Sequence, residues 1–150
     1  MKERDLILLI GSNPMNNYMV AKSFIKKRTV KTIWLIVSDR ENYRDKTGYF
    51  ETAKNLERSL KKIDDTIKIK IVEVKSASVE SIERELTTAK FSELRFETAF
   101  LHYTDGNLHL QIAFCRRVKN NNMGTVEIID GEPMLIGGDD SILEHLNYEI

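Results

Sequence analysis

The stretch Leu6-Ile7-Leu8-Leu9-Ile10-Gly11-Ser12-Asn13-Pro14 decides the fold of this chain. An uninterrupted apolar run, with charged residues before it and a glycine after it, is typical of a strand that is buried on both faces. Such strands belong to parallel sheets that carry helices on both sides. The polar turn leads into residues 16–27, where apolar side chains recur at helical spacing. We therefore expect the first strand, turn and helix of an α/β sheet.

The same alternation continues along the chain. Further strands are predicted over residues 30–37, 66–74 and 97–103, and further helices over residues 47–62, 76–89 and 108–119. Asp130-Gly131, between two short apolar runs, is a strong β-hairpin signal. The predicted fold class is α/β: a Rossmann-like, mostly parallel sheet with helices on both faces and a C-terminal β-hairpin. We place this domain in residues 1–136 and expect residues 137–150 to be a linker and the start of a helix.

Composition excludes several classes of protein. The 150 residues include 23 basic and 23 acidic side chains, whereas nonspecific binding of duplex nucleic acid needs an excess of basic ones. The lone Cys115 cannot form an intramolecular disulfide, and no cysteine–histidine cluster has the spacing of a zinc site. No apolar stretch is long enough to span a bilayer, and the first residues do not have the pattern of a signal peptide. We expect a cytoplasmic protein with no metal, no cofactor and no membrane segment.

Polar loops follow three of the predicted strands, at residues 11–17, 38–46 and 104–107. Ligands of open α/β sheets bind at these carboxyl ends. In the first loop Gly11 permits close approach, Ser12 and Asn13 offer donors and acceptors, and the following helix N-terminus favours a phosphate. The same residues also make an ordinary turn with a capping side chain. The residues alone leave these two interpretations open.

The loop Thr104-Asp105-Gly106-Asn107 repeats this pattern, although a carboxylate at Asp105 would repel a phosphate. A capped turn is the simpler interpretation here. His102 lies inside a predicted strand and is expected to be a core residue, whereas His109 is a weak candidate to face the site. The helix after this loop is expected to turn Leu108, Ile112 and Cys115 inward. No nucleophile–base set is apparent.

Taken together, these segments resemble the CARF domain, the CRISPR-associated Rossmann-fold sensor of type III CRISPR immunity. The resemblance rests on residues 6–21, 33–39, 52–56 and 101–114. Family members carry a similar first strand with a Gly-x-Asn-Pro-type loop. In the last segment they often have Asn-Tyr-Thr-Gly-Gly-Thr-Lys before a helix of small residues. The match covers nearly all of residues 5–136.

The resemblance implies a sensor that binds cyclic oligoadenylate, often cyclic tetra-adenylate, across the axis of a homodimer. It also implies allosteric control of an attached effector domain, expected beyond residue 150, in antiviral defence. The implied ligand-binding residues are Gly11, Ser12, Asn13, Pro14, Asn17, Ser38, Asp39, Thr104, Asp105, Gly106 and Asn107. No residue is assigned a catalytic role.

The chain departs from the family pattern in its last motif. Asp105 replaces a frequent glycine, Asn107 replaces a threonine, and Leu108 replaces a lysine that some ligand-cleaving members use. Loss of that charge-assisted contact costs about 1.5–3 kcal/mol. The domain alone is therefore expected to be a sensor more than an enzyme. A ring nuclease that cleaves cyclic oligoadenylate and a generic α/β interaction domain remain the alternatives.

Overall fold

Strands and helices alternate along the chain as the sequence predicts. The computed structural model describes residues 4–11, 13–39, 48–75, 78–121 and 123–136. The elements are β1 (Asp5–Leu9), α1 (Pro14–Lys27), β2 (Thr32–Ser38), α2 (Gly48–Ile63), β3 (Lys68–Val74), α3 (Val79–Glu85), the 3₁₀ turns η2 (Ala89–Phe91) and η3 (Phe96–Thr98), β4 (Phe100–His102), α4 (Leu108–Asn121), β5 (Gly124–Ile129) and β6 (Glu132–Ile136). The linker predicted over residues 137–150 lies outside the described residues.

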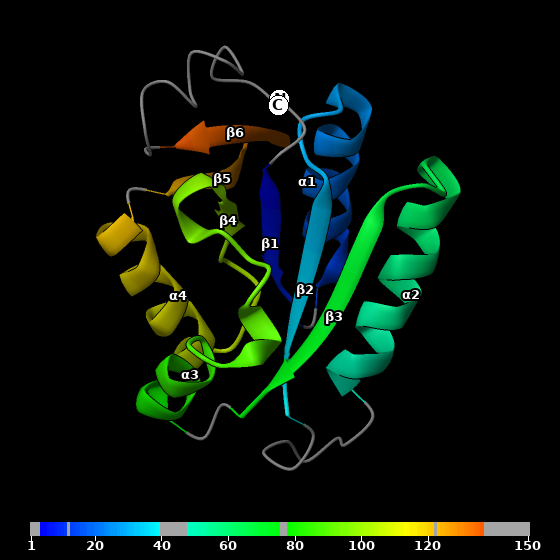
Figure 1. Cartoon of the computed structure of the whole chain (residues 1–150). Helices are drawn as coiled ribbons and strands as arrows, with labels where there is room; N and C mark the ends of the chain where they lie inside the picture. Colours follow the sequence, from blue (N-terminus) through cyan, green and yellow to red (C-terminus); the bar gives the residue numbers. More distant parts are fainter. Residues whose placement is uncertain (1–3, 12, 40–47, 76–77, 122, 137–150) are drawn as a thin grey trace.

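The strands form one sheet in the order β3-β2-β1-β4-β5-β6. The neighbours from β3 to β5 are parallel, and β6 pairs antiparallel with β5. Helices α1 and α2 cover one face, and α3 and α4 cover the other (Figure 1). The predicted α/β class, the mostly parallel sheet and the C-terminal hairpin are confirmed. The strand order reverses between β1 and β4, which places a topological switch point at their carboxyl ends.

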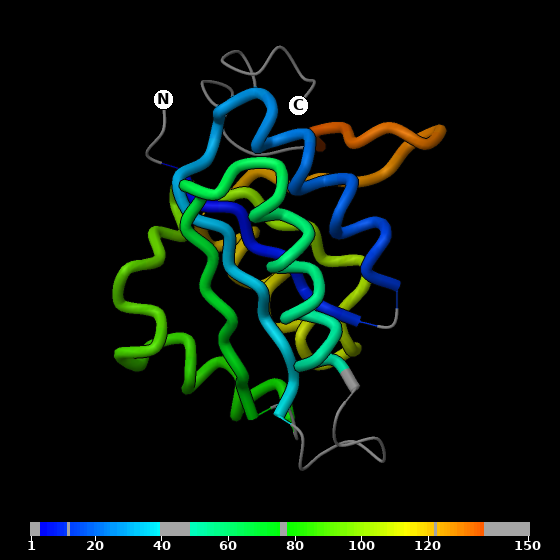
Figure 2. Tube along the Cα trace, turned by 90° about the vertical axis from the view of Figure 1, so that its right-hand side faces the viewer, coloured from blue at the N-terminus to red at the C-terminus, as the bar shows by residue number. Residues whose placement is uncertain are grey.

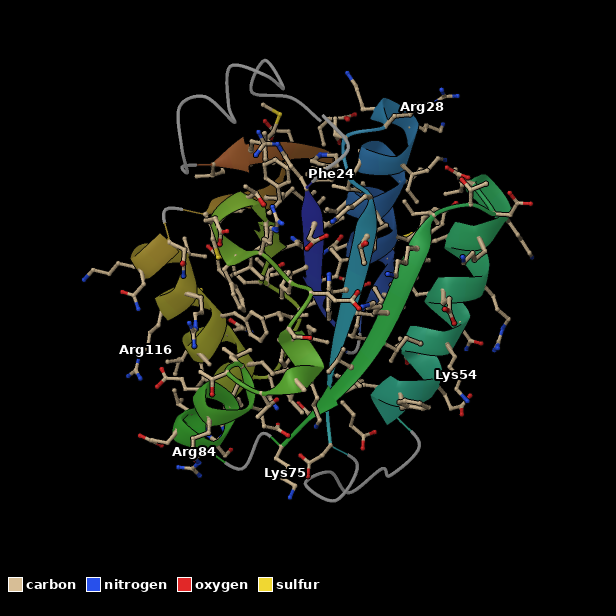
Figure 3. The ribbon with its side chains drawn as sticks, in the orientation of Figure 1. Phe24, Arg28, Lys54, Lys75, Arg84 and Arg116 are labelled. Carbon is tan, nitrogen blue, oxygen red and sulfur yellow. The ribbon has the colours of Figure 1, made fainter. Side chains whose placement is uncertain are left out.

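Every residue of β1 is buried, which explains its uninterrupted apolar run. Leu6 and Leu8 pack with α1 and α2, whereas Ile7 and Leu9 pack with α3 and α4. A strand enclosed on both faces has no position for a solvated side chain. The ring of Phe24 on α1 lies 5.1 Å from the ring of Phe100 and closes the first of these two cores. Figure 3 shows Phe24 in the interior, while the labelled basic side chains project outward.

Strand β3 forms one edge of the sheet, as its alternating lysines predict. Lys68 and Lys70 both pair with the carboxylate of Glu93. The Lys70 ammonium also lies 4.8 Å from the ring of Trp34, which is itself buried against Phe91. Long charged side chains therefore shield an edge strand that would otherwise expose its unpaired backbone.

Two predicted elements are shorter than expected. The helix predicted over residues 76–89 is α3 alone, which begins with the expected Ser78 cap in a reciprocal capping box with Ser81. The strand predicted over residues 97–103 is reduced to β4. The N–H of Thr98 bonds the carbonyl of Arg95 at 3.3 Å, so this stretch satisfies its backbone in a 3₁₀ turn before the chain joins the sheet.

The turn between β5 and β6 is the two-residue hairpin that the sequence predicts. Asp130 and Gly131 have φ values of 52° and 80°, the left-handed conformation that a tight hairpin with right-handed twist requires. Figure 2 shows this hairpin projecting beyond the helices.

The inward face predicted for α4 is wrong at its first residue. Leu108 is 67% exposed, and the fully buried side chains are Leu110, Ala113 and Phe114. Ile112 and Cys115 are only partly buried. Helix α4 follows the carboxyl end of β4, so its first residues extend past the end of the sheet. Its apolar face contacts the core from the third residue onward.

Candidate functional site

The carboxyl ends of β1 and β4 lie side by side, and the loops that follow them interlock. A Cβ atom on Gly11 would lie 1.5 Å from the carbonyl oxygen of Asp105. A Cβ on Gly106 would lie 2.7 Å from the Cβ of Leu9. Both positions therefore require glycine because backbone approaches backbone or a buried side chain. We call residues 11–14, 38–39 and 104–107 the carboxyl-edge site.

The first loop begins α1 with a side-chain cap. Asn13 is exposed, and its Oδ1 accepts a hydrogen bond of 3.3 Å from the N–H of Met15. Pro14 is the first helical residue, where its missing N–H costs nothing. Ser12, which the sequence also assigns to this loop, lies outside the described residues. The capped turn and the ligand loop are thus compatible, since the remaining N–H groups of the first turn face the same edge.

Asn17 lies beneath the first loop instead of on its surface. Its side chain is fully buried, and Nδ2 donates to the carbonyl of Leu9 at 3.5 Å. Its Oδ1 has no hydrogen-bond partner among the described residues. In this position the amide supports the end of β1 from the α1 side.

Asn107 joins the start of α4 to the end of β2. Its Oδ1 accepts from the N–H of Leu110 at 2.8 Å, and its Nδ2 donates to the hydroxyl of Ser38 at 2.6 Å. Ser38 is 3% exposed, and the next residue, Asp39, bonds its N–H to the carbonyl of Val74 at 2.7 Å. Because β1 lies between β2 and β4, the amide of Asn107 reaches over the end of β1.

Asp105 is held by a buried histidine. His102 is fully buried at the end of β4, as predicted, and its Nδ1 lies 3.0 Å from the carbonyl of Val126. Its Nε2 lies 3.2 Å from both Oδ2 of Asp105 and Oγ1 of Thr104. The carboxylate expected to repel a phosphate is therefore turned toward an imidazole, while Thr104 is exposed.

Two residues beside this loop were missed by sequence reasoning. Gln111 donates from Nε2 to the carbonyl of Gly106 at 2.6 Å, so it fixes the loop from the first turn of α4. Its position four residues after Asn107 was the available signal. Tyr103 donates to Glu127 at 2.6 Å, and this bond raises the pKa of the Tyr103 hydroxyl to about 12.

Exposed apolar side chains flank the carboxyl-edge site on both sides of the sheet. Met15 is 62% exposed in the first turn of α1, and Leu108 is 67% exposed in the first turn of α4. A groove of about 400 Å³ between α1 and α2 begins at Pro14 and Met15 and continues along Tyr18.

The Cys115 thiol on α4 is not activated as a nucleophile. Burial raises the pKa of the Cys115 thiol, which disfavours the reactive thiolate. Across the described ranges, no three His, Cys, Asp or Glu side chains come together as a metal site. No helix among the described residues is long and apolar enough to cross a membrane.

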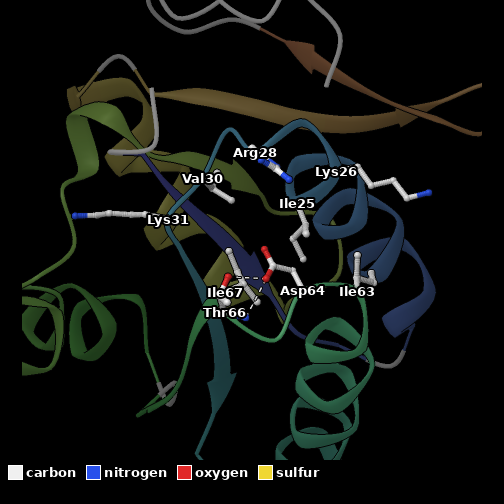
Figure 4. A pocket seen from close by; sticks show the side chains of 9 residues that line it. All are labelled: Ile25, Lys26, Arg28, Val30, Lys31, Ile63, Asp64, Thr66 and Ile67. Atoms are coloured by element: carbon white, nitrogen blue, oxygen red, sulfur yellow. Dashed lines mark hydrogen bonds between the residues drawn. The ribbon is translucent and has the colours of Figure 1, made fainter.

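A larger hollow, of about 770 Å³, lies at the opposite edge of the sheet, between the ends of α1 and α2. Its lining includes Lys26, Arg28 and Lys31. Figure 4 shows that the Lys26 and Lys31 side chains extend away from the hollow. Inside it, Asp64 accepts hydrogen bonds from the N–H and hydroxyl of Thr66 at 2.9 and 2.6 Å. The charged side chains that line this hollow do not point toward a common position. The hollow is therefore a weaker candidate for an anion site than the carboxyl-edge site.

Comparisons with known proteins place the fold. No family model and no curated protein sequence matches the chain. Among solved structures, Can2 from Sulfobacillus thermosulfidooxidans in complex with cyclic tetra-adenylate aligns with a TM-score of 0.66 at 12% identity, over 90% of this chain and 34% of that chain. Protein VC1899 from Vibrio cholerae aligns with a TM-score of 0.61 at 17% identity, over 89% of this chain and 33% of that chain.

Csm6 from Enterococcus italicus, bound to cyclic hexa-2'-fluoro-hexa-dAMP, aligns with a TM-score of 0.61 at 12% identity, over 86% of this chain and 34% of that chain. The chain thus spans about a third of the length of the solved chains that it matches. At these identities the likeness establishes the fold alone, and the chain has the fold of Can2, VC1899 and Csm6.

Proposed function

We propose that this chain binds cyclic oligoadenylate at the carboxyl-edge site. The observation that carries the proposal is the meeting of two glycine-containing loops and two helix starts at the switch point between β1 and β4. Helix N-termini attract phosphates through their free N–H groups and dipoles. Two proteins of the same fold, Can2 and Csm6, were solved with cyclic oligoadenylates bound.

The residues of the site divide into groups with different access to a ligand. The exposed side chains of Asn13 and Thr104 would bond the ligand directly, while Gly11 and Gly106 keep the loops tightly packed. Asn17 would act from beneath the loop. The remaining residues proposed to form the pocket are Ser12, Pro14, Ser38, Asp39, Asp105 and Asn107.

The proposed binding unit is a homodimer. A ring of identical nucleotides can lie on a two-fold axis, where one set of loops is used twice. Met15 and Leu108 are exposed on either side of the loops, so a second copy would remove apolar surface from water there. One chain then supplies half of the site.

We further propose that residues 1–136 are the sensor part of a longer cytoplasmic antiviral protein, with residues 137–150 leading toward an effector. This chain covers about a third of each solved chain that shares the fold, which is consistent with this arrangement. Ligand binding would act on the effector by favouring one arrangement of the dimer. The domain alone is proposed to act as a sensor more than as an enzyme, and a ring nuclease that cleaves the same ligand is the alternative.

Isothermal titration calorimetry with cyclic tetra-adenylate and cyclic hexa-adenylate tests the proposal. We expect heat with one of them at one ligand per two chains, and binding at least tenfold weaker in the variant Ser12→Ala/Asn13→Ala. The matched control is Ser23→Ala, a change of the same size in the body of α1. Absence of heat with both ligands, in a folded dimer, would overturn the proposal. Chromatography of the recovered ligand separates a sensor, which leaves it cyclic, from a ring nuclease.

A further inference from the structure

We propose that His102 and Asp105 form a proton-dependent positioning pair that sets the affinity of the carboxyl-edge site for anionic ligand. This inference rests on the proposed function. It concerns how the site is regulated: the protonated pair favours binding of phosphates, and loss of the proton weakens it.

The partners of His102 fix the direction of its hydrogen bonds. The carbonyl of Val126 can only accept, so Nδ1 of His102, 3.0 Å away, carries a hydrogen. In a neutral imidazole Nε2 is then an acceptor with one lone pair. That nitrogen lies 3.2 Å from the Asp105 carboxylate and 3.2 Å from the Thr104 hydroxyl.

The two partners of Nε2 respond differently to its charge. A hydroxyl both donates and accepts, so Thr104 can bond either form of the imidazole. An ionised carboxylate only accepts hydrogen bonds, so Asp105 bonds Nε2 of His102 when that nitrogen carries a proton. When Nε2 is unprotonated, its lone pair faces the carboxylate and no hydrogen bond forms. The protonated pair is an ion pair with a fully buried imidazole, and its carboxylate is largely buried. The neutral state loses the bond to Asp105 and keeps the one to Thr104.

This change reaches the ligand through the backbone and through charge. The carbonyl of Asp105 packs against Gly11 of the first loop, so the position of Asp105 sets how the two loops meet. Protonated His102 also cancels the negative charge of Asp105 next to the proposed phosphate position. The cancelled charge favours the anionic ligand in the protonated state.

Titratable groups on the described elements next to the imidazole include Glu127 and His109. The buried residues of α1 are Asn17, Val20, Ala21, Phe24 and Ile25, none of which titrates. The register partner of His102 on β1 is Leu8. On β5 the carboxylate of Glu127 bonds the Tyr103 hydroxyl. On α4, His109 is partly buried in the first turn and is a second titratable group close to the site.

The test compares affinities across the range from about pH 5 to 8. We expect cyclic tetra-adenylate to bind the whole chain about tenfold more weakly at high than at low pH within this range, a coupling of ordinary size. By reciprocity, binding at intermediate pH should take up a proton. Calorimetry in buffers of different ionisation enthalpy measures that uptake directly.

Asp105→Asn is the decisive variant. Its amide can donate to neutral Nε2, so the bond persists without the proton, and the pH dependence and proton uptake should disappear, whatever the affinity of the variant at a single pH. Glu127→Gln, the same chemical change on β5, and His109→Gln should both keep the pH dependence. His102→Gln, with folding checked by circular dichroism, should bind with little dependence on pH.

The outcomes separate the two proposals. No binding at any pH overturns the proposed function, and the inference falls with it. Binding that does not change with pH, or that changes equally in Asp105→Asn and the wild-type chain, overturns the inference alone. If pH dependence disappears in His109→Gln and persists in Asp105→Asn, the titrating group is His109 and the pair has no regulatory role.

Discussion

The two edges of the sheet differ in how they are built. At the carboxyl edge, loops from β1 and β4 interlock so closely that Gly11 and Gly106 have no room for a side chain. At the amino edge, a hollow of about 770 Å³ is open, and the Lys26 and Lys31 side chains extend away from it. The larger opening is therefore not the better candidate for an anion site. Convergence of polar groups from several elements distinguishes a binding site from a gap between helix ends.

The largest expected effect comes from separating the interlocked loops. In Gly11→Ala the new methyl group would overlap the carbonyl of Asp105, so the free energy of unfolding should fall by about 3 kcal/mol. Urea unfolding measures the loss. The control is Gly131→Ala, at a hairpin turn with φ of 80° and open space around it, where strain alone should cost about 1 kcal/mol. Equal stability of Gly11→Ala and the wild-type chain would show that the loops are not interlocked.

A smaller loss is expected from the amide that joins α4 to β2. Asn107→Ala removes the cap of α4 and the bond to Ser38, at a cost of about 2 kcal/mol. Asn107→Ser keeps a capping hydroxyl but cannot reach Ser38, so it should cost about half as much. Urea unfolding of both variants separates the two roles. A serine variant as unstable as the alanine variant would assign the whole effect to the bond with Ser38.

The next effect is a loss of stability in alkaline solution. The native pKa of Tyr103, about 12, lies above the ordinary value of about 10, so the native state keeps this proton longer than the unfolded chain. The stabilisation is complete below about pH 10 and is lost as pH rises through about 12. Unfolding by urea at alkaline pH should show this decline in the wild-type chain and a shallower one in Tyr103→Phe. Identical declines in the wild-type chain and in Tyr103→Phe would show that a group other than Tyr103 causes the loss of stability.

The smallest effect is expected at the amino edge. Replacing Lys26 and Lys31 together by glutamine should change the affinity for cyclic tetra-adenylate less than about twofold, because screened charges more than about 10 Å away contribute little. Titration calorimetry measures the affinity. A loss of affinity of tenfold or more would indicate that the anion binds in the hollow at this edge and not at the carboxyl-edge site.

Sequence pattern predicted the elements whose environment is uniform along their length. The run from Leu6 to Ile10 is buried on both faces, and Asp130-Gly131 has the one backbone conformation that its turn requires. The pattern failed where tertiary contacts override it. Residues 97–99 were predicted as the start of a strand, yet the chain crosses from α3 to the sheet there and turns in the 3₁₀ helix Phe96–Thr98. Leu108 is apolar, but it begins α4 above the sheet edge and remains exposed.

The candidate site was predicted in position but not in its internal bonds. Loops at the carboxyl ends of strands can be located from strand boundaries alone, so the loops that contain Gly11 and Thr104 to Asn107 were placed correctly, while their role in binding stays a prediction. The hydrogen-bond partners of these loops depend on the strand order. That order brings Ser38 next to Asn107, although the two residues are 69 positions apart in the sequence. The carboxylate of Asp105 was judged as an isolated charge, because nothing in the sequence places the buried His102 against it.

The bond between Asn107 and Ser38 also has a consequence for how the molecule opens. It links the half of the sheet formed by β1 to β3 with the half formed by β4 to β6, at the point where a doubly wound sheet would separate most easily. Local opening of one half must break this bond, which favours exchange of backbone amides through one cooperative unfolding event for both halves. The two halves should then have similar hydrogen-exchange protection, and they should diverge in a variant that lacks Asn107.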